Sequence, residues 1–231
     1  MLFRSALQPQ DLAAVSELLA RLNAGEAVGW ALSAAGWRLE TRPQAPSGLG
    51  GDAEDWCYHH CSSLGRPVYL IGGGHVSLAL TRLLVDLGFR VTVIEERTDV
   101  ATLEQNRSAW QRLQCGYESL ADVVTLGPDV FVAIMTHDHE RDAVALRALL
   151  TALADDQSLG YLGLLGSRAK IRQLLAAQRL NALQAKPWFH APMGIEIGSH
   201  TPQEIAVSIA AQMIELRNGV GTLGNESGCQ V

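Results

Sequence analysis

The chain has 231 residues, of which 48% are hydrophobic and 18% charged, so it can bury a sizeable core and is not disordered as a whole. Its net charge of −6 and aromatic content of 6%, without a long basic cluster, argue against nucleic-acid binding. No apolar run approaches the ~20 residues that span a bilayer, and the first residues lack the apolar core of a secretory signal, so we expect a cytoplasmic protein.

The cysteines are expected to be thiols, because a reducing compartment disfavours disulfides. There are four of them, Cys57, Cys61, Cys115 and Cys229. The first two form a C-x3-C pair with two histidines between them, which could bind a metal, although no second ligand pair follows at zinc-finger spacing. Local packing is the alternative interpretation of this pair.

The first third of the chain, residues 1–64, predicts a small α+β domain. Asp11 can cap a helix in which leucine and valine recur at helical spacing, and Gly25 would end it. Two short strands are predicted over 27–32 and 37–40, with a turn between them. Residues 42–51 are rich in proline and glycine, which predicts a loop or linker ahead of a domain boundary near residue 64.

From residue 67 onward, apolar runs alternate with helical repeats. The apolar run 67–71 is followed by three glycines, by a helical repeat that Gly88 ends, and by a second apolar strand over 91–94. This order predicts one βαβ unit with a right-handed crossover.

The alternation continues to the end of the domain. Strands are predicted over 122–126, 129–135 and 161–165, and the last two lead into helices capped by Thr136 or Asp138 and by Ser167. A final helix begins with a capping box at Thr201 and has proline at its first position. We therefore predict an α/β fold over residues 65–219, a Rossmann-like, doubly wound, mainly parallel sheet, followed by a loose tail at 220–231.

The glycine-rich turn is the strongest chemical signal. Gly72 and Gly74 match the first two positions of G-x-G-x-x-G, where glycine allows a sharp turn and lets the backbone approach a pyrophosphate at a helix N-terminus. Ser77 takes the third position, and Glu95 stands where an acid could bond a ribose hydroxyl. The alternative is a turn that serves tight packing alone.

Two further segments follow predicted strands and begin helices. Residues 136–139, Thr-His-Asp-His, could bind a metal, transfer protons or simply cap a helix. Ser167, Arg168 and Lys170 could form a second anion site or a capped helix with solvated charges. Because the ends of parallel strands meet at one sheet edge, we expect the polar side chains of these segments to share one pocket with His75 and His190.

These segments together resemble one known family. They are 70–76 (LIGGGHV), 91–97 (VTVIEER), 135–139 (MTHDH), 161–168 (YLGLLGSR), 190–195 (HAPMGI) and 201–210 (TPQEIAVSIA), in this order. The sequences of these segments and their order along the chain resemble those of the xanthine dehydrogenase accessory protein family, the XdhC/CoxI-like proteins. The resemblance covers about two thirds of the chain, the part from residue 67 to about 218.

The resemblance implies a maturation factor for a molybdenum hydroxylase and not a turnover enzyme. Such proteins bind the molybdenum cofactor, a molybdopterin or its dinucleotide, promote its sulfuration with a cysteine desulfurase and pass it to the apo-hydroxylase. Apart from the resemblance, assembly as a homo-oligomer stays open. The expected cofactor-binding residues are Gly72, Gly73, Gly74, His75, Glu95, Thr136, His137, Ser167, Arg168 and His190.

Two other functions stay open at this point. An NAD(P)-dependent oxidoreductase would use Gly72, Gly74 and Glu95 for its cofactor, with His75 or His137 as the acid–base group. A metal-dependent hydrolase would use His137, Asp138 and His139. The first third of the chain departs from the family pattern, because neither Cys57 nor Cys61 follows a glycine, so no role of a family cysteine is carried over.

Overall fold

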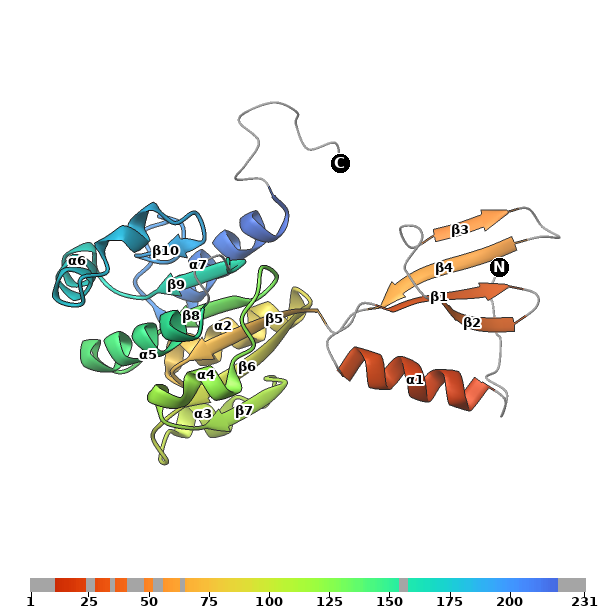
Figure 1. Cartoon of the computed structure of the whole chain (residues 1–231), viewed down its shortest axis with the longest axis horizontal. Coiled ribbons are helices and arrows are strands. Elements are labelled where there is room, and N and C mark those ends of the chain that lie inside the picture. The colour runs from red at the N-terminus through yellow and green to blue at the C-terminus, as the bar shows by residue number, and fades with distance from the viewer. Residues whose placement is uncertain are drawn as a thin grey trace, which may run out of the picture. The chain divides into compact units, whose positions relative to one another are not determined.

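The computed structural model describes residues 11–23, 28–33, 36–40, 48–51, 56–62, 65–153 and 158–219. The chain divides into two compact units, Met1–Gly65 and Arg66–Val231 (Figure 1). The predicted tail at 220–231 and residues 42–47 of the predicted linker lie outside the described ranges.

The first unit has one helix and a four-stranded antiparallel sheet in the order β2-β1-β4-β3. Its elements are α1 (Leu12–Asn23), β1 (Val28–Ser33), β2 (Gly36–Glu40), β3 (Gly48–Gly51) and β4 (Trp56–Ser62). The predicted helix and the pairing of the two hairpin strands are confirmed, and Gly25, the predicted end of the helix, lies outside the described residues. The predicted loop is wrong at Gly48–Gly51, where the glycine-rich segment pairs with β4, a strand that the sequence did not predict.

An aromatic cluster explains why β4 forms. Trp30 of β1 packs against Tyr58 and His60 of β4, with ring centroids 5.9 and 5.1 Å apart. Cys57 and His59 belong to the alternate positions of β4, and His59 Nδ1 lies 2.8 Å from a carboxylate oxygen of Glu40. The C-x3-C segment therefore lies in a strand, and the side chain of Cys61 lies outside the described atoms.

The second unit is built on a six-stranded sheet whose pairs are all parallel. The order is β7-β6-β5-β8-β9-β10, which is 3-2-1-4-5-6 when the strands are numbered from β5. This is the strand order of the Rossmann fold, so the predicted fold class is confirmed. The strands are β5 (Arg66–Ile71), β6 (Phe89–Glu95), β7 (Gln111–Gln114), β8 (Phe131–Ile134), β9 (Tyr161–Leu164) and β10 (Phe189–His190).

Helices cover both faces of this sheet (Figure 1). The longer ones are α2 (His75–Asp86), α5 (His139–Ala152), α6 (Arg168–Ala177) and α7 (Pro202–Arg217), with short helices α3 (Ala101–Gln105), α4 (Leu120–Val123), η2 (Tyr117–Ser119) and η3 (Asn181–Ala185). α2 and α7 pack on one face, and α4, α5 and α6 pack on the other. Within the described residues, no helix combines the length and apolar character needed to cross a membrane.

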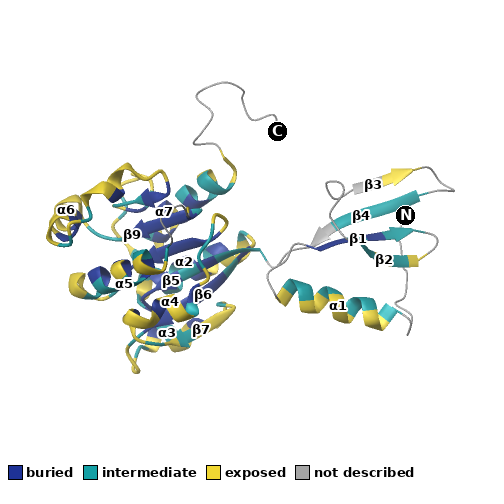
Figure 2. Ribbon diagram, viewed as in Figure 1, coloured by how far each residue is buried: buried dark blue, intermediate teal, exposed yellow. Residues whose placement is uncertain are grey.

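The core lies on both sides of the sheet, as Figure 2 shows by the dark strands between exposed helix surfaces. Neighbouring residues of β5 face opposite clusters: Leu70 packs with α2 and α7, and Ile71 packs with α5 and α6. Both are fully buried. Two buried faces explain why the central strands are almost continuously apolar in sequence.

One strand predicted in this unit is wrong, and two of its strands, β7 and β10, were not predicted. Residues 122–126 begin in α4 and continue as a loop, with Val124 packed into the core. The outer neighbour of β6 is instead β7, Gln-Arg-Leu-Gln. It lies at the sheet edge and is mostly exposed, so it lacks the apolar run that marks the central strands.

Candidate functional site

The glycine turn follows β5, at the point where the strand order of the sheet reverses, between β5 and β8. Gly72 donates its N–H to the carbonyl of Ile94 at 2.7 Å, and Met135 donates to the carbonyl of Ile71 at 2.8 Å. Gly72 has φ +109°, and a Cβ there would come within 2.4 Å of the Met135 carbonyl oxygen. Only glycine fits this position, as the motif predicts.

Gly74 serves a different purpose. It is the N-cap of α2 with φ −72°, and no side chain caps this helix. A Cβ at Gly74 would meet nothing within 4 Å, because the position faces open space. The residue thus has no need of a positive φ, and the N-terminus of α2 keeps first-turn N–H groups that could bind an anion.

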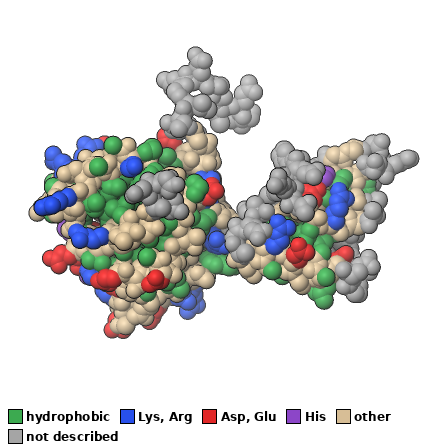
Figure 3. Space-filling model, in the orientation of Figure 1, with side chains coloured by type: hydrophobic (Ala, Val, Ile, Leu, Met, Phe, Trp, Pro, Cys, Tyr) green, Lys and Arg blue, Asp and Glu red, His purple; other side chains and the backbone are tan. Residues whose placement is uncertain are grey.

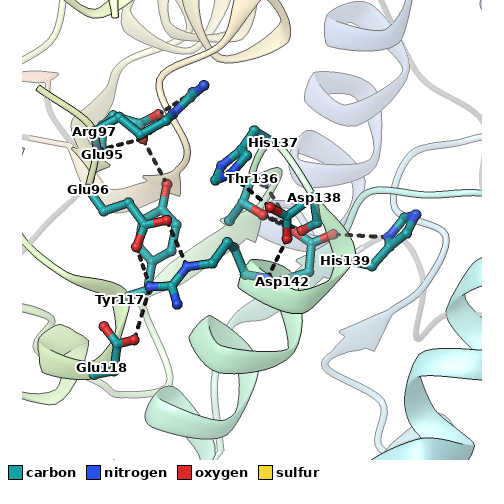
Figure 4. Close-up of polar contacts among 11 residues, drawn as sticks. Glu95, Glu96, Arg97, Tyr117, Glu118, Thr136, His137, Asp138, His139 and Asp142 are labelled. Carbon is teal, nitrogen blue, oxygen red and sulfur yellow. Dashed lines mark hydrogen bonds and ion pairs between the residues drawn. The ribbon is translucent and has the colours of Figure 1, made fainter. Parts of the chain in front are cut away.

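Glu95, at the end of β6, is hydrogen-bonded to the backbone of the glycine turn. Its carboxylate accepts the Gly73 N–H at 2.8 Å. It also accepts the Nε–H and Nη2–H of Arg97 at 2.9 and 3.0 Å (Figure 4). The side chain is fully buried. Burial alone would raise the pKa of Glu95, but the Arg97 guanidinium and the backbone N–H groups outweigh it and lower that pKa to about 2.

The carbonyl of Gly73 is fixed as well, because the buried Thr102 donates its hydroxyl to it. Both backbone groups of Gly73 are therefore bound by side chains from neighbouring elements, β6 and α3. In this arrangement the Glu95 carboxylate supports the protein backbone and is not presented to a ribose.

The loop after β8 is fixed by an acid on α5. Asp142 accepts the Thr136 N–H at 3.1 Å, and its Oδ1 lies 2.6 Å from the Thr136 hydroxyl. Burial is the larger influence and raises the pKa of Asp142. The two histidines pair with different carboxylates: His137 Nε2 lies 2.8 Å from Asp138, and His139 Nδ1 lies 3.6 Å from Asp142 (Figure 4).

Asp138 also caps α5 by accepting the Arg141 N–H at 2.8 Å, so the helix-cap interpretation of this segment is confirmed. Over the described part of the chain, no three or more His, Cys, Asp or Glu side chains are grouped to hold a metal ion.

A pocket of about 450 Å³ opens beside the glycine turn. Its lining comes from the carboxyl ends of β5, β6 and β8 and from α3: Gly74, His75, Arg97, Asp99, Val100, Ala101, Thr102, Gln105, Met135, Thr136 and His137. Four of the predicted site residues are among them, Gly74, His75, Thr136 and His137. The switch point of a parallel sheet is where such folds bind ligands.

The prediction of one shared pocket is wrong for the remaining segments. Arg168 lines a separate pocket of about 380 Å³ together with Arg172 and Gln184, and its exposed guanidinium pairs with Glu196 at 2.8 Å. Basic side chains gather around α6 (Figure 3). The physical reason is the strand order, which puts β8 between β5 and the strand that precedes Arg168.

Ser167 and His190 are likewise outside the pocket at the turn. Ser167 caps α6 by accepting the Lys170 N–H at 3.4 Å. His190 stacks on Tyr161 with ring centroids 5.0 Å apart, and its buried Nε2 has no hydrogen-bond partner among the residues that the structure describes. Burial lowers the pKa of His190, although Glu215 opposes this.

Arg97 and Thr102 were missed at the level of sequence. Arg97 stands two residues after Glu95, at the end of β6, and its side chain is 42% exposed beside a carboxylate with no exposure. Its position directly after a strand could have marked it as a site residue, because parallel sheets bind ligands at the carboxyl ends of their strands. The role of Thr102 depends on how α3 folds back onto the turn, which no local pattern indicates.

Comparison with known proteins decides the family. The XdhC Rossmann domain matches residues 68–213. The chain belongs to the XdhC family. This XdhC-family chain is 32% identical over 157 residues to the uncharacterized protein YqeB of Escherichia coli (strain K12), covering 66% of the chain and 28% of that protein.

A second relative is a probable xanthine dehydrogenase subunit from Bacillus subtilis (strain 168), 29% identical over 154 residues, covering 67% of the chain and 44% of that protein. The XdhC-family chain thus matches less than half the length of either relative. A crystal structure of a xanthine dehydrogenase from Bacillus halodurans has the same fold, with a TM-score of 0.67 at 23% identity over 92% of this chain and 66% of that one.

Proposed function

We propose that this chain serves the maturation of a xanthine dehydrogenase-type molybdenum hydroxylase by binding the molybdenum cofactor in the pocket at the glycine turn. Membership of the XdhC family supports the link to xanthine dehydrogenase. The observation that carries the binding site is the open helix terminus: α2 begins at the pocket without a side-chain cap, and Gly74 leaves room for a ligand there.

The residues around the pocket suit a phosphate-bearing pterin. A phosphate would accept the first-turn N–H groups of α2, and the helix dipole favours its charge. Arg97 adds N–H donors at the pocket edge, and His75 and His137 add ring nitrogens that can bond a polar heterocycle. When bound, the cofactor supplies the molybdenum centre of the hydroxylase; the chain would bind, orient and shield it.

Partners follow from this role. A cysteine desulfurase would provide the sulfur for sulfuration, and the apo-hydroxylase would receive the cofactor.

An NAD(P)-dependent oxidoreductase is the second candidate, and the Rossmann strand order favours it. Against NAD as its cofactor stands the Glu95 carboxylate, which is bound to the turn and to Arg97 instead of being available to a ribose. We favour the maturation function because membership of the XdhC family links the chain to xanthine dehydrogenase.

The test is Gly74→Ser. A serine at this N-cap would place its hydroxyl on the open N–H groups of α2, so the helix should be as stable as before or more so, while the anion site is filled. Purified protein would be mixed with molybdenum cofactor released from a molybdenum enzyme, and retained molybdenum and pterin fluorescence would be measured after gel filtration. We expect at least about a 10-fold loss of affinity with an unchanged melting temperature.

Gly127→Ser is the matched control, because a Cβ at Gly127 would meet nothing closer than 4.0 Å and the residue precedes β8 at the opposite edge of the sheet. Equal cofactor retention by the Gly74 and Gly127 variants would overturn the proposed site. Absence of cofactor binding by the unmodified protein would overturn the function itself.

A further inference from the structure

The position that recognises ribose in dinucleotide-binding folds is altered in this chain. In those folds an acid at the end of the second strand accepts the ribose hydroxyls. The second strand here is β6, and Glu95 is the acid at its end. The contacts of this one carboxylate therefore bear on which ligands the pocket accepts.

The Glu95 carboxylate has no acceptor capacity left. Two oxygens offer about four lone-pair sites. Five donors already approach them: the N–H of Gly73, the N–H, Nε–H and Nη2–H of Arg97, and the Tyr117 hydroxyl at 3.3 Å. The side chain is also fully buried, so a ribose hydroxyl can neither reach it nor find a free lone pair.

Arg97, in contrast to Glu95, keeps hydrogen-bonding groups that its partner does not use. A guanidinium has five N–H donors. Glu95 takes two of them, through Nε and Nη2, which leaves three. The bidentate bond fixes the plane of the guanidinium, and the residue lines the pocket with a side chain that is 42% exposed. Oriented N–H donors of this kind match the oxygens of a phosphoryl group.

We propose that Arg97 makes this pocket selective for a ligand with a phosphoryl group at the position where other dinucleotide folds hold a ribose diol, with Glu95 as the positioning residue. The inference rests on the proposed function only in taking the pocket at the glycine turn as the ligand site. Asp99 also lines the pocket and reduces its net positive charge. Selection must then come from oriented donors and not from charge alone.

Two probes that differ by one phosphate test this directly, adenosine 2′,5′-bisphosphate and 5′-AMP. Binding of each would be measured by calorimetry on the whole chain. The unmodified protein should bind the bisphosphate at least about 10-fold more tightly, which is the size of one charge-assisted bidentate contact. Equal affinity for the two probes, or no binding of either, would overturn the proposal.

Variants identify the residues responsible. Arg97→Gln should bring the ratio of the two affinities to within about 2-fold, and Arg97→Lys should restore it only in part, because an ammonium cannot form the fork. Glu95→Gln should lower the ratio while Arg97 remains, a change that a purely structural role of Glu95 would not produce. Arg90→Gln, at the other end of β6, is the control and should leave the ratio unchanged.

The same variants separate this inference from the proposed function. If the chain retains molybdenum cofactor but Arg97→Gln changes neither its affinity nor the probe ratio, the selectivity proposal fails and the maturation function stands. If the probes are discriminated through Arg97 while the cofactor does not bind, the maturation function fails and the phosphoryl selectivity stands.

Discussion

Glu95 is fully buried, yet it stays ionised because its neighbours replace the lost hydration. The pKa of Glu95 falls from 4.5 to about 2, with burial opposing the shift and Arg97 and the Gly73 N–H producing it. A carboxyl group with a lower pKa in the folded chain stabilises the fold above its unfolded pKa, and this contribution disappears as the pH falls toward the folded value.

Glu95→Gln should therefore destabilise the protein most at neutral pH. The shift corresponds to a contribution on the order of 3 kcal/mol, present above about pH 4.5 and lost between there and about pH 2. Urea unfolding of both proteins at about pH 7 and about pH 3 would measure it. If the difference in unfolding free energy between the unmodified protein and Glu95→Gln does not shrink at the lower pH, the pKa of Glu95 is not lowered as described.

Helices α5 and α6 show how elements begin at the functional edge of the sheet. Both start directly after a loop that follows a strand, and both have a side-chain cap. The Asp138 cap of α5 is charged and lies 2.8 Å from the Arg141 nitrogen, whereas the Ser167 cap of α6 is neutral and lies 3.4 Å from the Lys170 nitrogen. The α5 cap also bonds His137, so it orders part of the pocket lining.

Asp138→Ala should cost about 1 kcal/mol of unfolding free energy, a typical value for the loss of a good N-cap. Ser167→Ala is the paired variant and should cost less, because its cap bond is longer and uncharged. Thermal unfolding at neutral pH would compare them. An equal or larger loss for the Ser167 variant would show that cap geometry does not decide the stability of these helices.

At the scale of the whole molecule, the two core clusters belong to the second unit. One lies under α4, α5 and α6 and the other under α2 and α7, and all of their buried residues fall between Val68 and Met213. The first unit has its own sheet, with the Trp30 ring cluster and the buried Val28 and Ala31. The described residues thus assign a complete hydrophobic core to the Rossmann unit.

The fragment Arg66–Val231 should accordingly fold on its own. We expect a single cooperative unfolding transition within about 3 °C of the main transition of the full chain, measured by calorimetry. An insoluble fragment, or one without a cooperative transition, would contradict the independence of this unit.

The sequence alone determined the central architecture. Strands β5, β6, β8 and β9 were predicted because a strand buried on both faces must be apolar throughout, and the helix starts at Ser167 and Thr201 were predicted because capping is a local interaction. The need for glycine at Gly72 was also local, since it follows from a sharp turn at a strand end.

Only the tertiary structure decided the rest, because those features depend on which segments become neighbours. β3, β4 and β7 have no apolar run of their own and form by pairing with strands elsewhere in the chain. The strand order separates Arg168 from the turn. Glu95 was expected to bind a ribose, but its hydrogen bonds to the Gly73 N–H and to Arg97 make it a buried support for Arg97 instead. Residue spacing along a chain does not encode such contacts, since they arise from the packing of whole elements.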